Sequence, residues 1–307
     1  MTEESGAAEA AAKRLAVHAC AKINLFLRVT GRRPNGYHEL DSVFLPVSVA
    51  DAIGVEMRPA AISGVALKCD VPELTGGANL AARAAHAFLE EFGVSAQVLI
   101  ELEKHIPAGA GLGGGSSDAG AVLRTMARLE GIGAQDRMRT DRMRTDRMRK
   151  IAAALGADVP FFLDPRPARV RGIGELIEPL AEMPRLPLVI VAPPFQVSTA
   201  EIYNALAPEN WSGPAPAADL DAIARGEISP AMLVNDLAAP AIAKFPEIAR
   251  LKAMLESYGA RAVQMSGSGG SVFGIFKTDA EAEEAAAKMS RRAPFAAVTA
   301  ATTLATA

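Results

Sequence analysis

Apolar and polar residues alternate along residues 19–29 with the two-residue period of a β-strand. Lys22 and Asn24 fall on the same face, so we expect their side chains to project side by side, about 6–7 Å apart along the strand. A lysine on a strand is often only a solvated surface charge, so its surroundings must decide whether it has a function.

A tight turn rich in Gly, Pro and Asn follows at residues 31–36 and brings Tyr37 and His38 to its exit. An aromatic–histidine pair at such a place commonly serves packing. Further β-strands are predicted by the apolar patterns of residues 42–57, 96–104, 186–194 and 272–276.

Helical spacing of apolar residues appears between these strands. Asn79 is a predicted N-cap and Gly93 a predicted stop for the first helix. Other helices are expected at residues 116–129, up to Gly156, and at 197–206, 246–259 and 281–289. Residues 207–230 are rich in Ala and Pro and predict a loop. The mixture of strands and helices, with glycine-rich turns between them, indicates an α+β fold.

The stretch from Pro107 to Gly120 reads PAGAGLGGGSSDAG and holds six glycines. Glycine loses the most conformational freedom on folding, so such a cluster is costly unless the backbone has a task. A common task is to bring N–H groups against an anion. Ser116 and Ser117 read as helix N-caps, and a glycine loop at a helix N-terminus is a ready phosphate site. We therefore interpret this stretch as a nucleotide phosphate cradle rather than a linker.

Composition narrows the class of protein. The chain has 307 residues, of which 50% are hydrophobic, enough for one large or two ordinary domains. A net charge of −3 lacks the basic footprint of a nucleic-acid-binding protein. Two cysteines, Cys20 and Cys69, give neither a disulfide framework nor a paired-cysteine metal site. Without a signal peptide or an apolar run of about 18 residues, we expect a cytoplasmic protein with no membrane partner.

Residues 136–150 repeat a five-residue unit, DRMRT DRMRT DRMRK. A step of five residues advances about 500° round a helix, so the methionines scatter and form no coherent buried face. The whole repeat carries seven basic and three acidic residues, a local charge of +4. It is either a basic arm or a tandem expansion tolerated on an exposed helix or loop, and we favour the expansion because charge runs are usually solvated.

Asp158 stands between Ala157 and the apolar run Val159-Pro160-Phe161-Phe162. A carboxylate in such surroundings is rarely left without a partner, because an unpaired buried charge is heavily penalised. It is expected to cap a backbone group or to take part in chemistry. A second glycine turn, at residues 264–271, runs into a strand.

Four motifs in this order resemble the galactokinase–homoserine kinase–mevalonate kinase–phosphomevalonate kinase (GHMP) superfamily. Three of them are GAGLGGGSSDA, GADVPFF and SGSGGS, and the fourth is the early segment AKINLFLRVTGRRPNGYHELDSVF. The early segment resembles the branch whose acceptor is a methylerythritol unit linked to cytidine diphosphate. The resemblance covers residues 21–276. It implies phosphoryl transfer from ATP, with Mg²⁺ carried on the nucleotide, to a tertiary hydroxyl in the non-mevalonate route to isoprenoid precursors.

The resemblance also implies roles for individual residues. Lys22 and Asp158 match the catalytic pair: Asp158 would accept the hydroxyl proton, while Lys22 would keep it ionised and lower the pKa of the hydroxyl. The acceptor would be bound by Asn24, by Tyr37 and His38 at the cytosine ring, and by Gly267, Ser268 and Gly269 of the last motif. The triphosphate would be bound by Pro107, Ala108, Gly109, Ala110, Gly111, Leu112, Gly113, Gly114, Gly115, Ser116 and Ser117.

The superfamily fold has two α+β lobes: an N-terminal one with a left-handed βαβ crossover and a C-terminal ferredoxin-like one. We accordingly expect a disordered tail at residues 1–13, an ATP-binding and catalytic domain at 14–175, and a second domain at 176–307. No dedicated protein metal site and no nucleic-acid partner are expected, only small-molecule substrates.

Three other interpretations remain. Gly109, Gly111 and Gly114 also fit a dinucleotide-binding fingerprint, but the acid at the required spacing, Asp136, lies in the repeat with no strand around it. A nucleotide sensor without catalysis would not need Lys22 and Asp158. A kinase for homoserine or mevalonate would not need NGYHEL, because neither acceptor carries a base. A Walker loop is excluded, since the chain contains no Gly-Lys-Ser/Thr.

Overall fold

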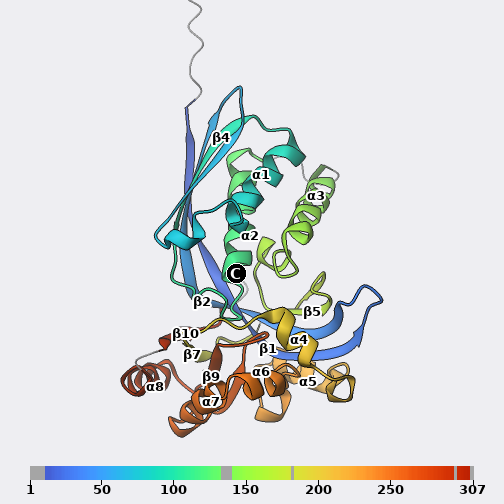
Figure 1. The fold of residues 1–307 in the computed structure, drawn as a ribbon, viewed down its shortest axis with the longest axis vertical. Coiled ribbons are helices and arrows are strands. Elements are labelled where there is room, and N and C mark those ends of the chain that lie inside the picture. Colours follow the sequence, from blue (N-terminus) through green and yellow to red (C-terminus); the bar gives the residue numbers. More distant parts are fainter. Residues whose placement is uncertain (1–10, 133–139, 181–182, 294–295, 305–307) are drawn as a thin grey trace, which may run out of the picture.

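The computed structural model describes residues 11–132, 140–180, 183–293 and 296–304. They form two β-sheets with helices (Figure 1). The α+β class expected from the sequence is thus what the structure contains.

The first sheet has six strands in the order β3-β4-β2-β5-β6, with β1 paired to β2. The strands are β1 (Lys13–Arg32), β2 (His38–Pro59), β3 (Gly64–Cys69), β4 (Ala96–Glu103), β5 (Ala168–Gly172) and β6 (Leu176–Pro179). β1 and β2 form a long antiparallel pair with irregularities at three places, between Cys20 and Lys22, Asn24 and Phe26, and Val29 and Gly31. Such irregularities bend a strand and re-aim its side chains.

Three helices belong to this part of the chain: α1 (Leu80–Phe92), α2 (Gly114–Leu129) and α3 (Thr140–Leu155) (Figure 1). α1 lies between β3 and β4, α2 comes after β4, and α3 comes after α2. The predicted caps of α1 are confirmed, because the Asn79 side chain accepts from the N–H of Ala81 and Gly93 is left-handed. α1 connects β3 to β4, which run parallel and so complete a βαβ unit. Apolar residues of α1 and α2 pack with Val55, Val98 and Ile100 of the strands in one buried cluster.

The second sheet is antiparallel, with the order β10-β7-β9-β8. It consists of β7 (Pro187–Ala192), β8 (Ala262–Met265), β9 (Val272–Ile275) and β10 (Ala297–Thr302), with α7 (Glu247–Ser257) before β8 and α8 (Asp279–Arg292) after β9. The chain order is strand, helices, strand, strand, helix, strand, which is the ferredoxin-like arrangement. β7 is apolar on both faces and lies between two layers. Val189 and Val191 face the helices, whereas Leu188 and Ile190 face β1 and β2.

The predicted loop at residues 207–230 is wrong in part, because α5 (Ala217–Ala224) lies within it. Leu220 and Ile223 of α5 pack against the cluster between the two sheets, so packing forms a helix despite the flanking prolines. The remaining helices are α4 (Thr199–Ala205), α6 (Ala238–Lys244) and the short 3₁₀ turns Pro72–Leu74, Phe161–Leu163, Pro208–Asn210 and Pro230–Met232.

The two predicted boundaries, at the end of the tail and between the domains, do not coincide with the limits of the first sheet. β1 begins at Lys13, inside the segment predicted as a tail, and residues 1–10 of that tail lie outside the described residues. β6 pairs with β5 and ends at Pro179, so the first sheet extends past the predicted domain boundary at Glu175.

The described part of the repeat, from Thr140 on, belongs to α3. Met143 is 67% exposed, as expected for a tolerated expansion. Met148, however, packs against the buried cluster formed by α1, α2 and the strands of the first sheet. Arg147 bonds Glu91 at 2.8 Å and lies over the ring of Phe92. The last unit of the repeat therefore anchors α3 to α1.

Candidate active site

The glycine loop joins β4 to the N-terminus of α2 with a backbone that L-residues rarely adopt. Gly111 and Gly113 have φ values of 76° and 72°. A Cβ on Gly111 would meet the backbone oxygens of Ser266 and Gly269, so glycine is required there for conformation and for space.

The predicted serine N-cap of α2 is wrong. The helix begins at Gly114 with Gly113 as the cap residue and no side-chain cap bond. Ser117 instead turns inward and donates to the carbonyl of Cys20 at 2.6 Å, while Ser116 lines the cleft. Without a side-chain cap, the first N–H groups of α2 remain available to an anion.

Lys22 and Asp158 come together although 136 positions separate them in the sequence. Lys22 Nζ lies 3.4 Å from Asp158 Oδ2 and donates to Asn24 Oδ1 at 2.6 Å. The ammonium also lies 4.6 Å from the ring centroid of Phe44. The lysine side chain is 4% exposed and the aspartate side chain 31% exposed, so the carboxylate is the member of the pair open to a ligand.

Backbone and side-chain bonds fasten the last glycine turn to the other motifs. The Ser266 hydroxyl donates to the carbonyl of Gly111 at 2.9 Å and accepts from the N–H of Asn24. Asn235 donates to the carbonyls of Met265 and Gly267, each at 2.9 Å. The glycine loop, β1 and the last turn are thus held as one assembly.

A cleft of about 480 Å³ lies among these groups. Its lining includes Lys22, Asn24, Asp158, Gly267, Ser268 and every residue from Pro107 to Ser116. Of the predicted site residues, Tyr37, His38, Ser117 and Gly269 are not in the described lining. A Cβ on Gly269 would meet the sulfur of Met265.

His38 reaches the cleft through an aromatic neighbour. Its ring stacks on Tyr203 with centroids 5.0 Å apart, and Tyr203 lines the cleft. Trp211 meets the edge of the same imidazole at 5.9 Å. Burial, together with the charge of Arg32, lowers the pKa of His38, which favours the neutral ring. Tyr37 is 59% exposed beside this group.

The sequence did not point to several residues that line the cleft. Thr199 and Tyr203 come from α4, a helix that the sequence predicted at residues 197–206, but nothing in the sequence marked its face toward the cleft. Lys104 and Asp118 also line the cleft and were not singled out. A lysine at a strand end and an aspartate after serines resemble surface charges when only the sequence is known.

Comparison with known proteins identifies the family. The family model "GHMP kinases N terminal domain" matches residues 79–164, and "GHMP kinases C terminal" matches residues 217–294. A 4-diphosphocytidyl-2-C-methyl-D-erythritol kinase from Anaeromyxobacter dehalogenans is 41% identical over 286 residues, covering 91% of this chain and 86% of the relative. The chain belongs to the 4-diphosphocytidyl-2-C-methyl-D-erythritol kinase family.

Two further comparisons support the same family, and a third shows the fold alone. The kinase of this name from Thermus thermophilus is 42% identical over 267 residues, covering 87% of this chain and 89% of the relative. A crystal structure of a 4-(cytidine 5'-diphospho)-2C-methyl-D-erythritol kinase superposes with a TM-score of 0.78 at 40% identity and covers 94% of this chain and 99% of that one. A homoserine kinase from Cytophaga hutchinsonii, at 18% identity, shares the fold with a TM-score of 0.70 and 95% coverage of both chains.

Family membership settles the class of protein. The two-lobed GHMP kinase fold and a small-molecule kinase are confirmed, and the dinucleotide-binding interpretation is wrong. Among the helices that the structure describes, none is long and apolar enough to cross a membrane.

Proposed function

We propose that this kinase transfers the γ-phosphoryl group of ATP to the tertiary 2-hydroxyl of 4-diphosphocytidyl-2-C-methyl-D-erythritol, a step toward isoprenoid precursors. The observation that carries the proposal is the contact between Lys22 and Asp158, 3.4 Å apart at a cleft lined by the glycine loop. The names of the relatives, at about 40% identity over most of the chain, support the choice of acceptor.

In this proposal Asp158 accepts the proton of the acceptor hydroxyl. Its partly exposed carboxylate can meet a hydroxyl, whereas Lys22 is buried and fixed by Asn24 and Phe44. The lysine ammonium stabilises the negative charge that develops on the attacking oxygen. A phosphoryl transfer has a loose transition state, so positioning and charge neutralisation count for more than base strength.

The donor triphosphate is proposed to lie against the backbone of residues 107–116, at the N-terminus of α2. The uncapped helix start and the glycines of positive φ give a cradle of N–H groups that side chains do not obstruct. Mg²⁺ would arrive on the nucleotide, because it keeps several waters and binds mainly through substrate phosphates. The open cradle, with the Asp158 carboxylate at its edge, fits such an ion, which would neutralise phosphate charge.

The acceptor is proposed to lie across Asn24, Gly267 and Ser268, with its cytosine ring at Tyr37 and His38. Tyr203 supports the His38 ring from the cleft side, so a base could stack on the same aromatic group. Ser117 and Gly269 do not line the described cleft, so they would act indirectly, by keeping the backbone around them in place. We further propose that the protein works in the cytoplasm on small molecules alone, with neither nucleic acid nor membrane as partner.

The test is ATP consumption with the cytidine-diphosphate-linked methylerythritol, compared with homoserine and mevalonate at equal concentration. Turnover with the first acceptor and none above background with the other two is expected. Equal turnover with all three, or none with the first, would refute the proposal.

A further inference from the structure

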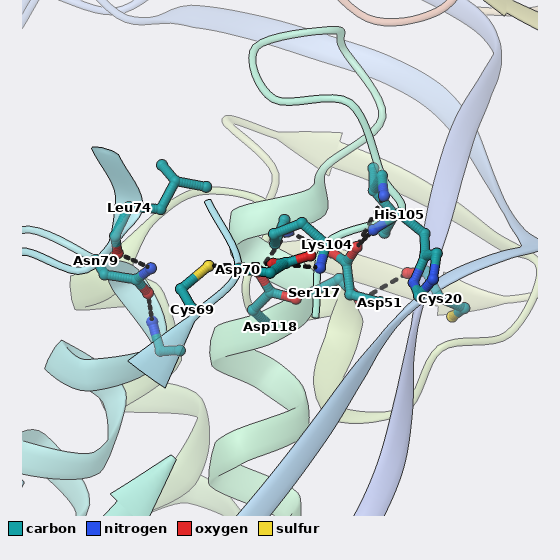
Figure 2. A network of polar contacts seen from close by, with 12 residues as sticks. Cys20, Asp51, Cys69, Asp70, Leu74, Asn79, Lys104, His105, Ser117 and Asp118 are labelled. Carbon is teal, nitrogen blue, oxygen red and sulfur yellow. Dashed lines mark hydrogen bonds and ion pairs between the residues drawn. The ribbon is translucent and has the colours of Figure 1, made fainter. Parts of the chain in front are cut away.

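At the wall of the cleft, three charged side chains form a buried network that the proposed chemistry does not use. Figure 2 shows the Lys104 side chain between the carboxylates of Asp51 and Asp118. Lys104 Nζ bonds Asp51 Oδ2 and lies 2.7 Å from Asp118 Oδ2. The three side chains are 7%, 0% and 3% exposed, so water screens these contacts weakly.

The network ties the entrance of the glycine loop to its exit. Lys104 directly follows β4, and Asp118 lies in the first turns of α2, fourteen positions later. Asp51 adds a second tie at the entrance, since its Oδ1 accepts from the N–H groups of His105 at 2.6 Å and Ile106 at 2.8 Å. The contact between Lys104 and Asp118 therefore closes the loop at its base.

A purely structural ion pair would be expected to satisfy both carboxylate oxygens. Asp118 Oδ1 is buried and has no hydrogen-bond partner among the residues that the structure describes. Burial raises the pKa of Asp118 to about 7, although Lys104 acts in the opposite direction. The network thus keeps an unfavourable carboxylate next to the phosphate cradle, where stability alone would favour an apolar pair of the same size.

We propose that Lys104 and Asp118 are positioning residues for the nucleotide donor, holding the glycine loop in the shape that binds the triphosphate. The inference rests on the proposed function, in which residues 107–116 bind ATP. Neither residue needs to touch the reacting atoms. Because phosphoryl transfer depends on positioning, a loop displaced by about 1 Å can cost about 100-fold in rate or affinity.

The experiment compares Lys104→Met and Asp118→Asn with a matched control, Lys68→Met. Lys68 lies on β3 beside β4 and forms an exposed ion pair with Glu101 at 3.5 Å, away from the loop. The first readout is the Kd of adenylyl imidodiphosphate with Mg²⁺, measured by calorimetry, next to the Kd of the acceptor. The second is amide hydrogen exchange of peptides covering residues 105–117.

Lys104→Met is expected to weaken binding of the ATP analogue by about 10-fold or more and to change the affinity for the acceptor less than about 2-fold. Amide hydrogen exchange in the loop should become faster. Asp118→Asn should do the same to a smaller degree, because its amide oxygen can still accept from Lys104. Lys104→Arg should recover part of the affinity, and Lys68→Met should match the unaltered protein. If Lys104→Met does not fold, the Asn and Arg variants carry the comparison.

A lowered melting temperature with unchanged analogue affinity and unchanged loop exchange would overturn the inference, because that is the result of a structural ion pair. If the unaltered protein binds no ATP analogue, the proposed function itself fails. If it binds the analogue and the variants bind equally well, only the positioning role fails.

Discussion

At the scale of single residues, the candidate site contains two opposite charges of different exposure. Lys22 is 4% exposed and Asp158 is 31% exposed, so the cation is fixed while the carboxylate faces the cleft. The spacing of Lys22 and Asn24 on one strand face was enough to predict that they lie side by side. The partner of Asp158 came from the family resemblance, because no local pattern links residues so far apart in the chain.

Replacing Asp158 by Asn tests the role of the carboxylate. Turnover should fall by at least roughly 10²–10⁴-fold, because a positioned base contributes about that much. The melting temperature should change little, since Lys22 keeps its contact with Asn24. Steady-state rates and calorimetry with the ATP analogue check this, with Asp164→Asn, at an exposed aspartate paired to Arg166, as the control. Loss of analogue binding would place Asp158 in the wrong role.

Asp118 gives the protein a pH-dependent stability of predictable sign. Its pKa is raised by burial to about 7, from an ordinary value of 3.8, with Lys104 and Asp51 as the charges that face it. The folded state therefore binds more protons than the unfolded state between these values, and this group makes stability fall as pH rises from about 4 to 7. Asp118→Asn should remove that slope, so its stability relative to the unaltered protein should increase with pH.

Urea unfolding at several pH values between 4 and 8 measures the effect. If the stability of Asp118→Asn relative to the unaltered protein stays constant over this range, or falls as pH rises, the assignment of the raised pKa to Asp118 is contradicted.

At the scale of elements, the open backbone of the glycine loop was predicted correctly from the sequence, whereas the cap of the helix after it was not. The cluster of glycines predicted an open backbone before a helix, which the positive φ of Gly111 and Gly113 explains. The serine cap failed because α2 already begins at Gly114, with Gly113 as its cap residue, and Ser117 bonds the carbonyl of Cys20 in β1. That bond comes from tertiary packing, which the local sequence does not encode. Lys104 was missed for the same reason.

Gly111→Ala and Gly131→Ala form a matched pair for the loop. Both glycines have positive φ, 76° and 66°, but only at Gly111 would a Cβ meet backbone atoms; at Gly131 nothing lies within 4 Å. Gly131→Ala should cost about 1–3 kcal/mol from conformation alone. Gly111→Ala should lower the free energy of unfolding by more than this, and it should also weaken binding of the ATP analogue. Unfolding curves and calorimetry decide, and equal effects of the two changes would show that the contact with the last glycine turn is unimportant.

The repeat permits a test of α3. Deleting residues 136–145 removes two units and leaves Arg147 and Met148, which contact α1 and the first core. We expect unchanged kinetics and a small change in melting temperature. As a comparison, Arg147→Ala should lower stability by about 1 kcal/mol or less, because its ion pair with Glu91 is partly exposed. A loss of turnover on deletion would mean that the repeat positions Asp158.

At the scale of the whole molecule, two sheets share one apolar cluster in which Ile23 and Leu45 meet Ile190 and Phe273. Periodicity predicted five of the ten described strands (β1, β2, β4, β7 and β9), most of the described helices and the α+β class. It could not predict the strand order or the ferredoxin-like arrangement, because these depend on pairings between distant segments such as β7 and β10. They were expected only from the family resemblance.

We propose that this chain phosphorylates the 2-hydroxyl of 4-diphosphocytidyl-2-C-methyl-D-erythritol. Phosphorus and carbon NMR of the product, made with ATP and Mg²⁺, tests it most directly. We expect one new phosphomonoester, with phosphorus coupled to the quaternary carbon that bears the methyl group. A phosphate on another hydroxyl, or an unchanged acceptor, would contradict it.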